Sequence, residues 1–166
     1  MPALEAGVSA PEIKLPLMGG DEFSLNQARK RGPVVLAFFK VNCPVCQLAF
    51  PFLERIYRAY SGSQKFTMVG VSQNDVPETK AFNREFGITF PMLLDDTRKY
   101  PASNAYGLTN VPSTFLISPE GEVEFSSVSW SKKDFEELNQ KLADISGVSP
   151  AKLFKPGEQV PDFRPG

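Results

Sequence analysis

Hydrophobic and polar positions divide the chain into short apolar runs and stretches with helical periodicity. Residues 34–39 (VVLAFF) are continuously apolar and rich in β-branched and aromatic side chains, which is typical of a strand buried on both faces of a mostly parallel sheet. From Leu48 to Tyr60 the apolar side chains recur at helical spacing and predict an amphipathic helix. Pro51 lies inside this helix and removes a backbone donor, so we expect a kink there and no break. Residues 66–71 form a second apolar run and predict another buried strand.

Turn and capping residues locate the other elements. Gly19 and Gly20 predict the turn of an N-terminal β-hairpin, and Ser24 is expected to cap a short helical segment over 25–31. The elements predicted farther along are a helix over 77–86 capped by Asp75 and ended by Gly87, an extended piece over 90–94, a short helix over 99–106, a strand over 111–117, its antiparallel partner over 122–127, and a helix over 131–145 opened by Ser131. Strands that alternate with helices in this way predict an α/β fold with a mixed central sheet flanked by helices.

Composition limits the number of domains and the kinds of partner. The chain has 166 residues, 42% of them hydrophobic, and a formal net charge of -1. This size fits one domain with a substantial core, which we expect over 1–147, and the composition argues against disorder. The near-neutral charge argues against a nucleic-acid surface, so we expect a small, nearly neutral molecule or another protein as the partner.

The sequence contains no stretch with the character of a membrane anchor or an export signal. No apolar run approaches the roughly 18 residues of a membrane span, and residues 1–20 lack a charged start followed by an apolar stretch. The compartment stays open: we expect it to be cytoplasmic for the chain as printed, and periplasmic or extracytoplasmic if a signal or anchor was removed from it.

A polar, proline-rich tail follows the predicted domain over residues 148–166. Within it, residues 156–163 echo residues 6–13: in each, a glycine lies four positions before a proline, and an acidic and an apolar residue follow. Three interpretations of this tail are open. They are a chance match between two loop-like segments, the start of a second, truncated module, and an arm that docks on the sheet.

The only two cysteines, Cys43 and Cys46, lie three positions apart between the first buried run and the amphipathic helix. A helix that begins at Cys43 would bring both sulfurs onto one face, within reach of a disulfide. The chain has no histidine, and one cysteine pair supplies two of the four ligands of a structural zinc site. A purely structural disulfide across so small a loop would contribute little unfolded-state entropy. A redox-active dithiol is therefore the favoured interpretation.

Three features favour the reactive thiolate form at Cys43, because a redox cysteine attacks as a thiolate and needs its pKa lowered. Cys43 is expected at the N-terminus of the helix, where unpaired N–H groups and the helix dipole favour an anion. Lys40 is placed to add a positive charge, although a solvated lysine is the commoner outcome, and Pro44 suits the first helical turn. We expect an exposed Cys43 to attack a partner and a more buried Cys46 to resolve the mixed disulfide.

Residues 38–46 (FFKVNCPVC) and 111–117 (VPSTFLI), followed by a turn over 118–121, resemble a thioredoxin-fold protein. The chain is most similar to the TlpA-like thiol-disulfide oxidoreductases and the related alkyl hydroperoxide reductase/thiol-specific antioxidant (redoxin) group. This similarity spans about 11–145. It implies a thioredoxin-like fold, in which 76–94 correspond to the helix-strand insertion of the TlpA-like members.

The resemblance also implies roles for individual residues. Cys43 matches the attacking cysteine and Cys46 the resolving one, while Pro112 matches a cis-proline beside the dithiol. Val111 would offer its backbone to a bound partner, with Asn42 and Pro44 also in the substrate-binding rim. Asn42 replaces a frequent tryptophan, which makes the rim more polar. A buried acid of thioredoxins is replaced by alanine at position 37, so proton transfer to or from Cys46 lacks its usual carboxylate, and another acid, Asp75 or Glu78, or water must serve.

The function implied by the resemblance is the reduction, or exchange, of disulfides in partner proteins by the Cys43/Cys46 dithiol. No cofactor is expected beyond the redox-active disulfide, and the expected partners are protein thiols and disulfides and an upstream electron donor, with the chain acting as a monomer. One alternative is a peroxiredoxin-type peroxidase, although Leu36 and Lys40 occupy the positions of its proline and its threonine or serine. The other is a non-enzymatic binding module whose disulfide stays closed.

Overall fold

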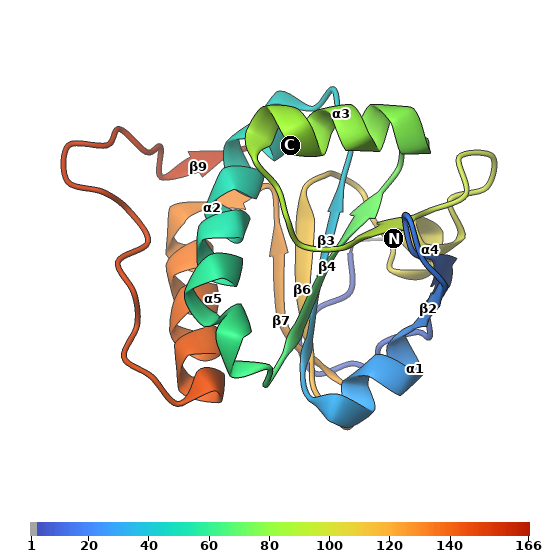
Figure 1. Ribbon diagram of the computed structural model, residues 1–166, viewed down its shortest axis with the longest axis horizontal. Coiled ribbons are helices and arrows are strands. Elements are labelled where there is room, and N and C mark those ends of the chain that lie inside the picture. The colour runs from blue at the N-terminus through green and yellow to red at the C-terminus, as the bar shows by residue number, and fades with distance from the viewer. Residues whose placement is uncertain (1–2) are drawn as a thin grey trace.

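The structure, a computed structural model, describes residues 3–166 and shows a central sheet with helices on both faces (Figure 1). The strands are β1 (Lys14–Pro16), β2 (Glu22–Ser24), β3 (Val34–Phe39), β4 (Thr67–Ser72), β5 (Met92–Leu94), β6 (Ser113–Ile117), β7 (Val123–Val128), β8 (Trp130–Ser131) and β9 (Phe163–Arg164). The helices are α1 (Leu25–Ala28), α2 (Pro44–Tyr60), α3 (Val76–Phe86), α4 (Pro101–Ala105) and α5 (Lys132–Ser146), with 3-10 turns η1 (Arg29–Arg31) and η2 (Ser61–Ser63). Within residues 3–166, no helix is long and apolar enough to cross a bilayer.

The central sheet has the strand order β5-β4-β3-β6-β7. Parallel pairing joins β3 to β4 and β4 to β5, whereas β6 runs antiparallel to both β3 and β7. β1 and β2 pair antiparallel as a separate hairpin near the start of the chain, and α3 with β5 forms the helix-strand piece expected over 76–94. The mixed sheet, its flanking helices and the N-terminal hairpin predicted from the sequence are therefore confirmed.

β3 occupies the middle of the sheet and is buried along its whole length. Side chains alternate between the two faces of a strand. Val35, Ala37 and Phe39 accordingly belong to the hydrophobic cluster with side chains of α2, α3 and α5. Leu36 and Phe38, which point to the other face, belong to a second hydrophobic cluster with side chains of the hairpin, α1 and α4. Because both faces are covered, this strand requires the continuous apolar run that the sequence shows.

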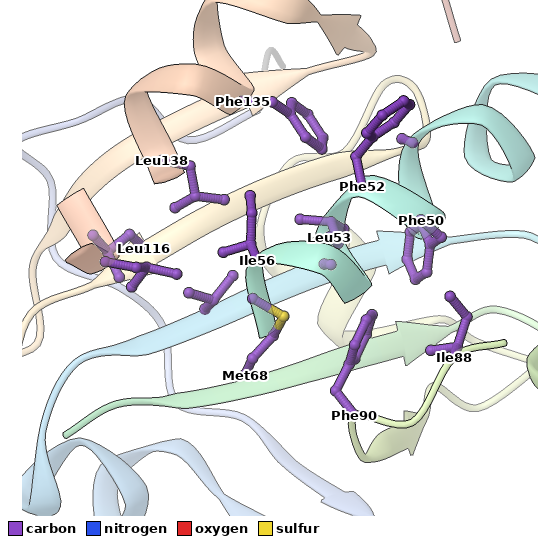
Figure 2. Packing of buried hydrophobic residues seen from close by; sticks show 14 of the residues in the cluster. Phe50, Phe52, Leu53, Ile56, Met68, Ile88, Phe90, Leu116, Phe135 and Leu138 are labelled. Carbon is purple, nitrogen blue, oxygen red and sulfur yellow. The ribbon is translucent and has the colours of Figure 1, made fainter. Parts of the chain in front are cut away.

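Helix α2 contributes many of the side chains that fill the first cluster. Figure 2 shows the side chains of α2 in the space between the sheet and α5, among them Phe50, Phe52, Leu53 and Ile56. The Phe50 ring lies 4.3 Å from the ring of Phe39, and burial of one such side chain stabilises the fold by roughly 1.5–3 kcal/mol. The helix continues through Pro51 without a break, as predicted. This packing holds the first turns of α2 against the end of β3.

Side-chain caps begin three of the helices at the predicted residues. Ser24, Asp75 and Ser131 each accept a hydrogen bond from a backbone N–H in the first turn of α1, α3 and α5. Gly87 ends α3 at a φ of 68°, a left-handed conformation that glycine adopts without a steric cost. Local sequence therefore determines where these helices begin and where α3 ends.

The short helix predicted over 99–106 begins later than expected, at Pro101. The residue before a proline is disfavoured in the right-handed helical region, and Tyr100, which precedes this proline, lies outside the helix with a left-handed backbone at a φ of 47°. The buried carboxylate of Asp95 caps α4 from outside the helix, accepting hydrogen bonds from the N–H groups of Ala102 and Ser103 at 3.1 and 2.9 Å. The prediction was wrong at this boundary because the cap comes from a residue that is distant in the sequence.

Residues 148–166 return along the outer side of α5 and α2 to the end of the sheet where β3 passes into α2 (Figure 1). Leu153 is buried, and the ring of Phe154 lies 5.2 Å from that of Phe52. The guanidinium of Arg55 makes two hydrogen bonds to the carboxylate of Glu158, at 2.8 and 2.7 Å. The tail thus docks on helices and, through β9, on β8, and not on the central sheet.

We expect the docking of this tail to weaken at low pH. The hydrogen bond from Arg55, followed by one from the backbone of Lys155, lowers the pKa of Glu158 from 4.5 to about 2. Because the folded-state pKa lies below the ordinary one, the stabilisation from this carboxylate is complete above pH 4.5 and is lost as the pH falls through about 2. Trp130, the only tryptophan, is covered by Phe154 and donates its indole N–H to the carbonyl of Pro161 at 2.7 Å. Its emission should therefore shift to longer wavelength as the tail detaches.

The control for this prediction is a pair of variants. Glu158→Gln should show the shifted emission of Trp130 at pH 5, before any acidification. Glu137→Gln, at an exposed position of α5, should keep the acid transition of the unsubstituted chain, with circular dichroism reporting that the sheet stays folded. Identical emission of Glu158→Gln and the unsubstituted chain at every pH would contradict the role of Glu158.

Candidate active site

Cys43 and Cys46 lie where the central strand β3 passes into helix α2. Cys43 is the N-cap of α2, and Pro44 is the first residue of the helix. The sulfur of Cys43 accepts a hydrogen bond from the backbone N–H of Cys46 at 3.2 Å. The sulfur therefore satisfies one of the N–H groups that the first turn of a helix leaves without a partner within the helix.

The two sulfurs differ in their access to solvent. Both cysteines are free thiols; Cys43 is half-buried, and Cys46 is 0% exposed. Burial raises the pKa of the Cys46 thiol, and its hydrogen bond with Cys43 raises it further, whereas a backbone hydrogen bond from Lys40 lowers it. No carboxyl group in the described part of the chain contributes to this shift. Cys46 is therefore held as a neutral thiol behind Cys43.

Pairing of β6 with β3 brings Val111 and Pro112 to the cysteines. Phe38 is opposite Ser113 in the sheet, so the loop before β6 lies beside the loop after β3. The peptide bond between Val111 and Pro112 is cis. The thiol of Cys43 donates to the carbonyl oxygen of Val111 at 3.5 Å. A residue 68 positions along the chain thus provides a main-chain acceptor for the more exposed sulfur.

The other predicted site residues surround this pair. Asn42 and Pro44 flank Cys43 and are exposed. Lys40 is also exposed, and together with Val111 it lines a cavity of about 160 Å³. All the residues singled out from the sequence are therefore gathered at one end of the sheet.

Asn74 and Gln47 hold the loop before Cys43, and sequence reasoning missed both. The side-chain oxygen of Asn74 accepts from the N–H of Val41 at 3.0 Å, and the side-chain amide of Gln47 donates to the carbonyl of Val41, also at 3.0 Å. Both main-chain polar groups of Val41 are thus fixed by side chains from other elements. The only available signal was the position of Asn74 two residues after a buried parallel strand, since such strands end at the same side of a sheet.

Comparisons with known proteins agree with this geometry. The model of the AhpC/TSA family matches residues 6–126. The thiol-disulfide oxidoreductase ResA of Geobacillus thermodenitrificans is 31% identical over 144 residues, which cover 86% of this chain and 79% of that protein. ResA of Bacillus subtilis is 32% identical over 125 residues, covering 73% of this chain and 66% of that protein.

Solved structures show the same fold. The thioredoxin domain of a thiol-disulfide oxidoreductase from Bacteroides vulgatus superimposes with a TM-score of 0.73 at 24% identity, covering 84% of this chain and 98% of that one. A thiol:disulfide interchange protein from Bacteroides sp. superimposes with a TM-score of 0.70 at 25% identity, covering 85% and 91%. The resemblance and the thioredoxin-like fold predicted from the sequence are confirmed. The chain belongs to the AhpC/TSA family, as a ResA-like thiol-disulfide oxidoreductase with the cysteine pair Cys43 and Cys46.

Proposed function

We propose that this protein reduces disulfide bonds in partner polypeptides, with Cys43 as the attacking thiol and Cys46 as the resolving thiol. The observation that carries the proposal is the difference in access between the two sulfurs. Cys43 is half-buried at the start of α2, whereas Cys46 is 0% exposed behind it. A partner disulfide can approach the first sulfur and not the second.

The reaction proceeds in two exchanges that balance in atoms and electrons. The thiolate of Cys43, having lost its proton to water, attacks one sulfur of the partner disulfide; a mixed disulfide forms, and one partner thiolate leaves and takes a proton from water. Cys46 then loses its proton and attacks the sulfur of Cys43. The Cys43–Cys46 disulfide forms, the second partner thiolate leaves and is protonated, and the partner has gained the two electrons that the dithiol has lost.

The neutral state of Cys46 orders these two exchanges. Its raised pKa, caused first by burial and then by the hydrogen bond with Cys43, keeps it protonated while Cys43 attacks. Asp75 and Glu78 are exposed, and the carboxylate of Asp75 accepts the N–H of Glu78 as the cap of α3. Since no carboxyl group of residues 3–166 contributes to the pKa shift of Cys46, we assign the acceptance of its proton to water.

The surroundings of the pair favour a polypeptide as substrate. The backbone carbonyl of Val111, beside Pro112, accepts the thiol of Cys43 and can accept a main-chain N–H of a bound segment in its place, and Asn42 and Pro44 form the exposed rim. Lys40 adds a positive charge that acts on Cys46. A dithiol donor must restore the reduced pair after each cycle. All these groups lie on one chain, so one copy suffices for the reaction.

The test mixes the reduced protein with a protein disulfide such as insulin and counts the electrons transferred between them. Alkylation and mass analysis should show both thiols of the pair lost for each partner disulfide reduced, because the chain has no other cysteine. Hydrogen peroxide supplied instead should oxidise Cys43 no faster than it oxidises a small free thiol. The proposal would be contradicted if the Cys43/Cys46 pair stayed reduced and insulin stayed intact at every ratio of reduced to oxidised glutathione that sets the potential of the mixture.

A further inference from the structure

Residues 161–166, here called the C-terminal strip, run as an extended segment beside β8. Within the strip, β9 pairs antiparallel with β8, with Arg164 opposite Trp130 and Phe163 opposite Ser131. The backbone N–H of Lys132 donates to the carbonyl of residue 162 at 2.9 Å. The strip therefore runs as a short strand beside β8 toward the end of the central sheet at which the cysteines lie (Figure 1).

The strip ends on the loop that contains Val111. The N–H of Gly166 donates to the hydroxyl of Ser129 at 2.9 Å, and the side-chain amide of Asn110 donates to the main-chain oxygen of Gly166 at 2.7 Å. A Cβ on Gly166 would overlap the carbonyl oxygen of Val111. That oxygen also accepts the thiol of Cys43 at 3.5 Å. The strip and the attacking sulfur therefore meet at the same carbonyl.

The strip is recognised through its backbone and not through its side chains. Phe163 is 54% exposed, and the guanidinium of Arg164 bonds only to the carbonyl of its own neighbour. Addition of an extended segment to a sheet edge through main-chain hydrogen bonds tolerates many sequences, since specificity requires pockets for side chains. The surface under the strip can therefore accept a different extended polypeptide, with a small residue where Gly166 faces Val111.

We propose that the C-terminal strip occupies the position in which an extended partner polypeptide docks beside Cys43, so that the partner must displace it. This inference rests on the proposed function, because it takes the partner to be a polypeptide. The partner is recognised as an extended main chain that pairs with β8 and ends against Val111. The strip competes with the partner for this position within the same molecule.

The residues before the strip keep it close even when it is displaced. Leu153 is buried, Val160 packs against the first hydrophobic cluster, and Glu158 is paired with Arg55. A segment tethered in this way competes at a high effective concentration. It raises the apparent KM for a protein substrate without changing the chemistry at the sulfurs.

The experiment removes the strip in two ways and compares large and small substrates. One variant lacks residues 163–166, and the other carries Gly166→Val, whose side chain collides with the carbonyl of Val111. If the strip occupies its position about 70–90% of the time, both variants should lower the KM for insulin about three- to tenfold. Their kcat, and their rate with a small aromatic disulfide that needs no docking strand, should stay unchanged. Arg164→Ala is the matched control, because its guanidinium hydrogen-bonds only within the strip, to the carbonyl of Phe163, and it should keep the original KM.

Two outcomes separate this inference from the proposed function. If both variants keep or raise the KM for insulin while the activity still depends on Cys43, the competition is overturned and the proposed function stands. If neither the original chain nor the variants reduce insulin, the proposed function fails. A synthetic peptide of residues 159–166 should inhibit the deletion variant competitively against insulin and leave the small disulfide unaffected; lack of inhibition would also count against the competition.

Discussion

Replacement of Cys43 by serine should abolish the reduction of protein disulfides, with a loss of at least about a thousandfold in rate. A serine hydroxyl at the N-cap can still accept the N–H of residue 46, so α2 should form as before. It cannot attack a disulfide, because the reaction needs a sulfur nucleophile that is ionised near neutral pH. The measurement is insulin reduction with a thiol reductant in excess, and the fold is checked by the emission of Trp130.

The remaining thiol makes this test specific. Cys46 is 0% exposed and its pKa is raised by burial, so it cannot replace Cys43 as the attacking group. Glu137→Gln is the control: it changes an exposed side chain of α5 outside the rim of the pair and leaves both sulfurs in place, so turnover should persist. Undiminished activity of Cys43→Ser would exclude Cys43 as the nucleophile.

Replacement of Cys46 should convert the protein from a catalyst into a trap. Cys43 still attacks, but no second thiol of the chain can release the mixed disulfide, since the chain has only these two cysteines. Multiple turnover should fall by about a hundredfold or more, and a covalent complex of the variant with its partner should accumulate. A gel without reducing agent shows this complex, and dithiothreitol dissolves it.

The choice of substitution matters because position 46 is buried. Serine would leave a hydroxyl in an apolar environment, which costs about 1–3 kcal/mol if the hydroxyl finds no partner. Cys46→Ala avoids this cost, so both variants should be compared, with glutathione excluded because it would resolve the complex from outside. Normal turnover of a folded Cys46→Ala variant, without any trapped complex, would show that Cys46 does not resolve the intermediate.

Much of the fold was predictable because its signals are local. The continuous apolar run of β3 reflects burial on both faces, and the helical spacing along α2 reflects a single buried side. Capping by Ser24, Asp75 and Ser131 involves residues three positions apart. Such interactions depend on a few neighbouring residues, so they can be recognised without the rest of the chain.

Boundaries and supports determined by distant residues were not predictable in the same way. The start of α4 depends on Asp95, which lies seven positions before the N–H of Ala102. The loop before Cys43 is held by Asn74, which is 33 positions from Val41. From the sequence, an asparagine that follows a strand could hydrogen-bond to many parts of the chain. Only the parallel register of β3 and β4 brings Asn74 beside Val41.

The sequence by itself determined the reactive pair, the strand before it and the helix after it, because spacing, periodicity and the absence of histidine are properties of the chain read in order. The resemblance implied that Val111 and Pro112 lie beside the pair, but only the tertiary structure decided which atoms meet there. The antiparallel register of β6 on β3 brings Val111 against Cys43 across 68 positions, and the docked tail brings Gly166 against Val111. These contacts arise from the packing of elements that are far apart along the chain, so no local pattern contains them.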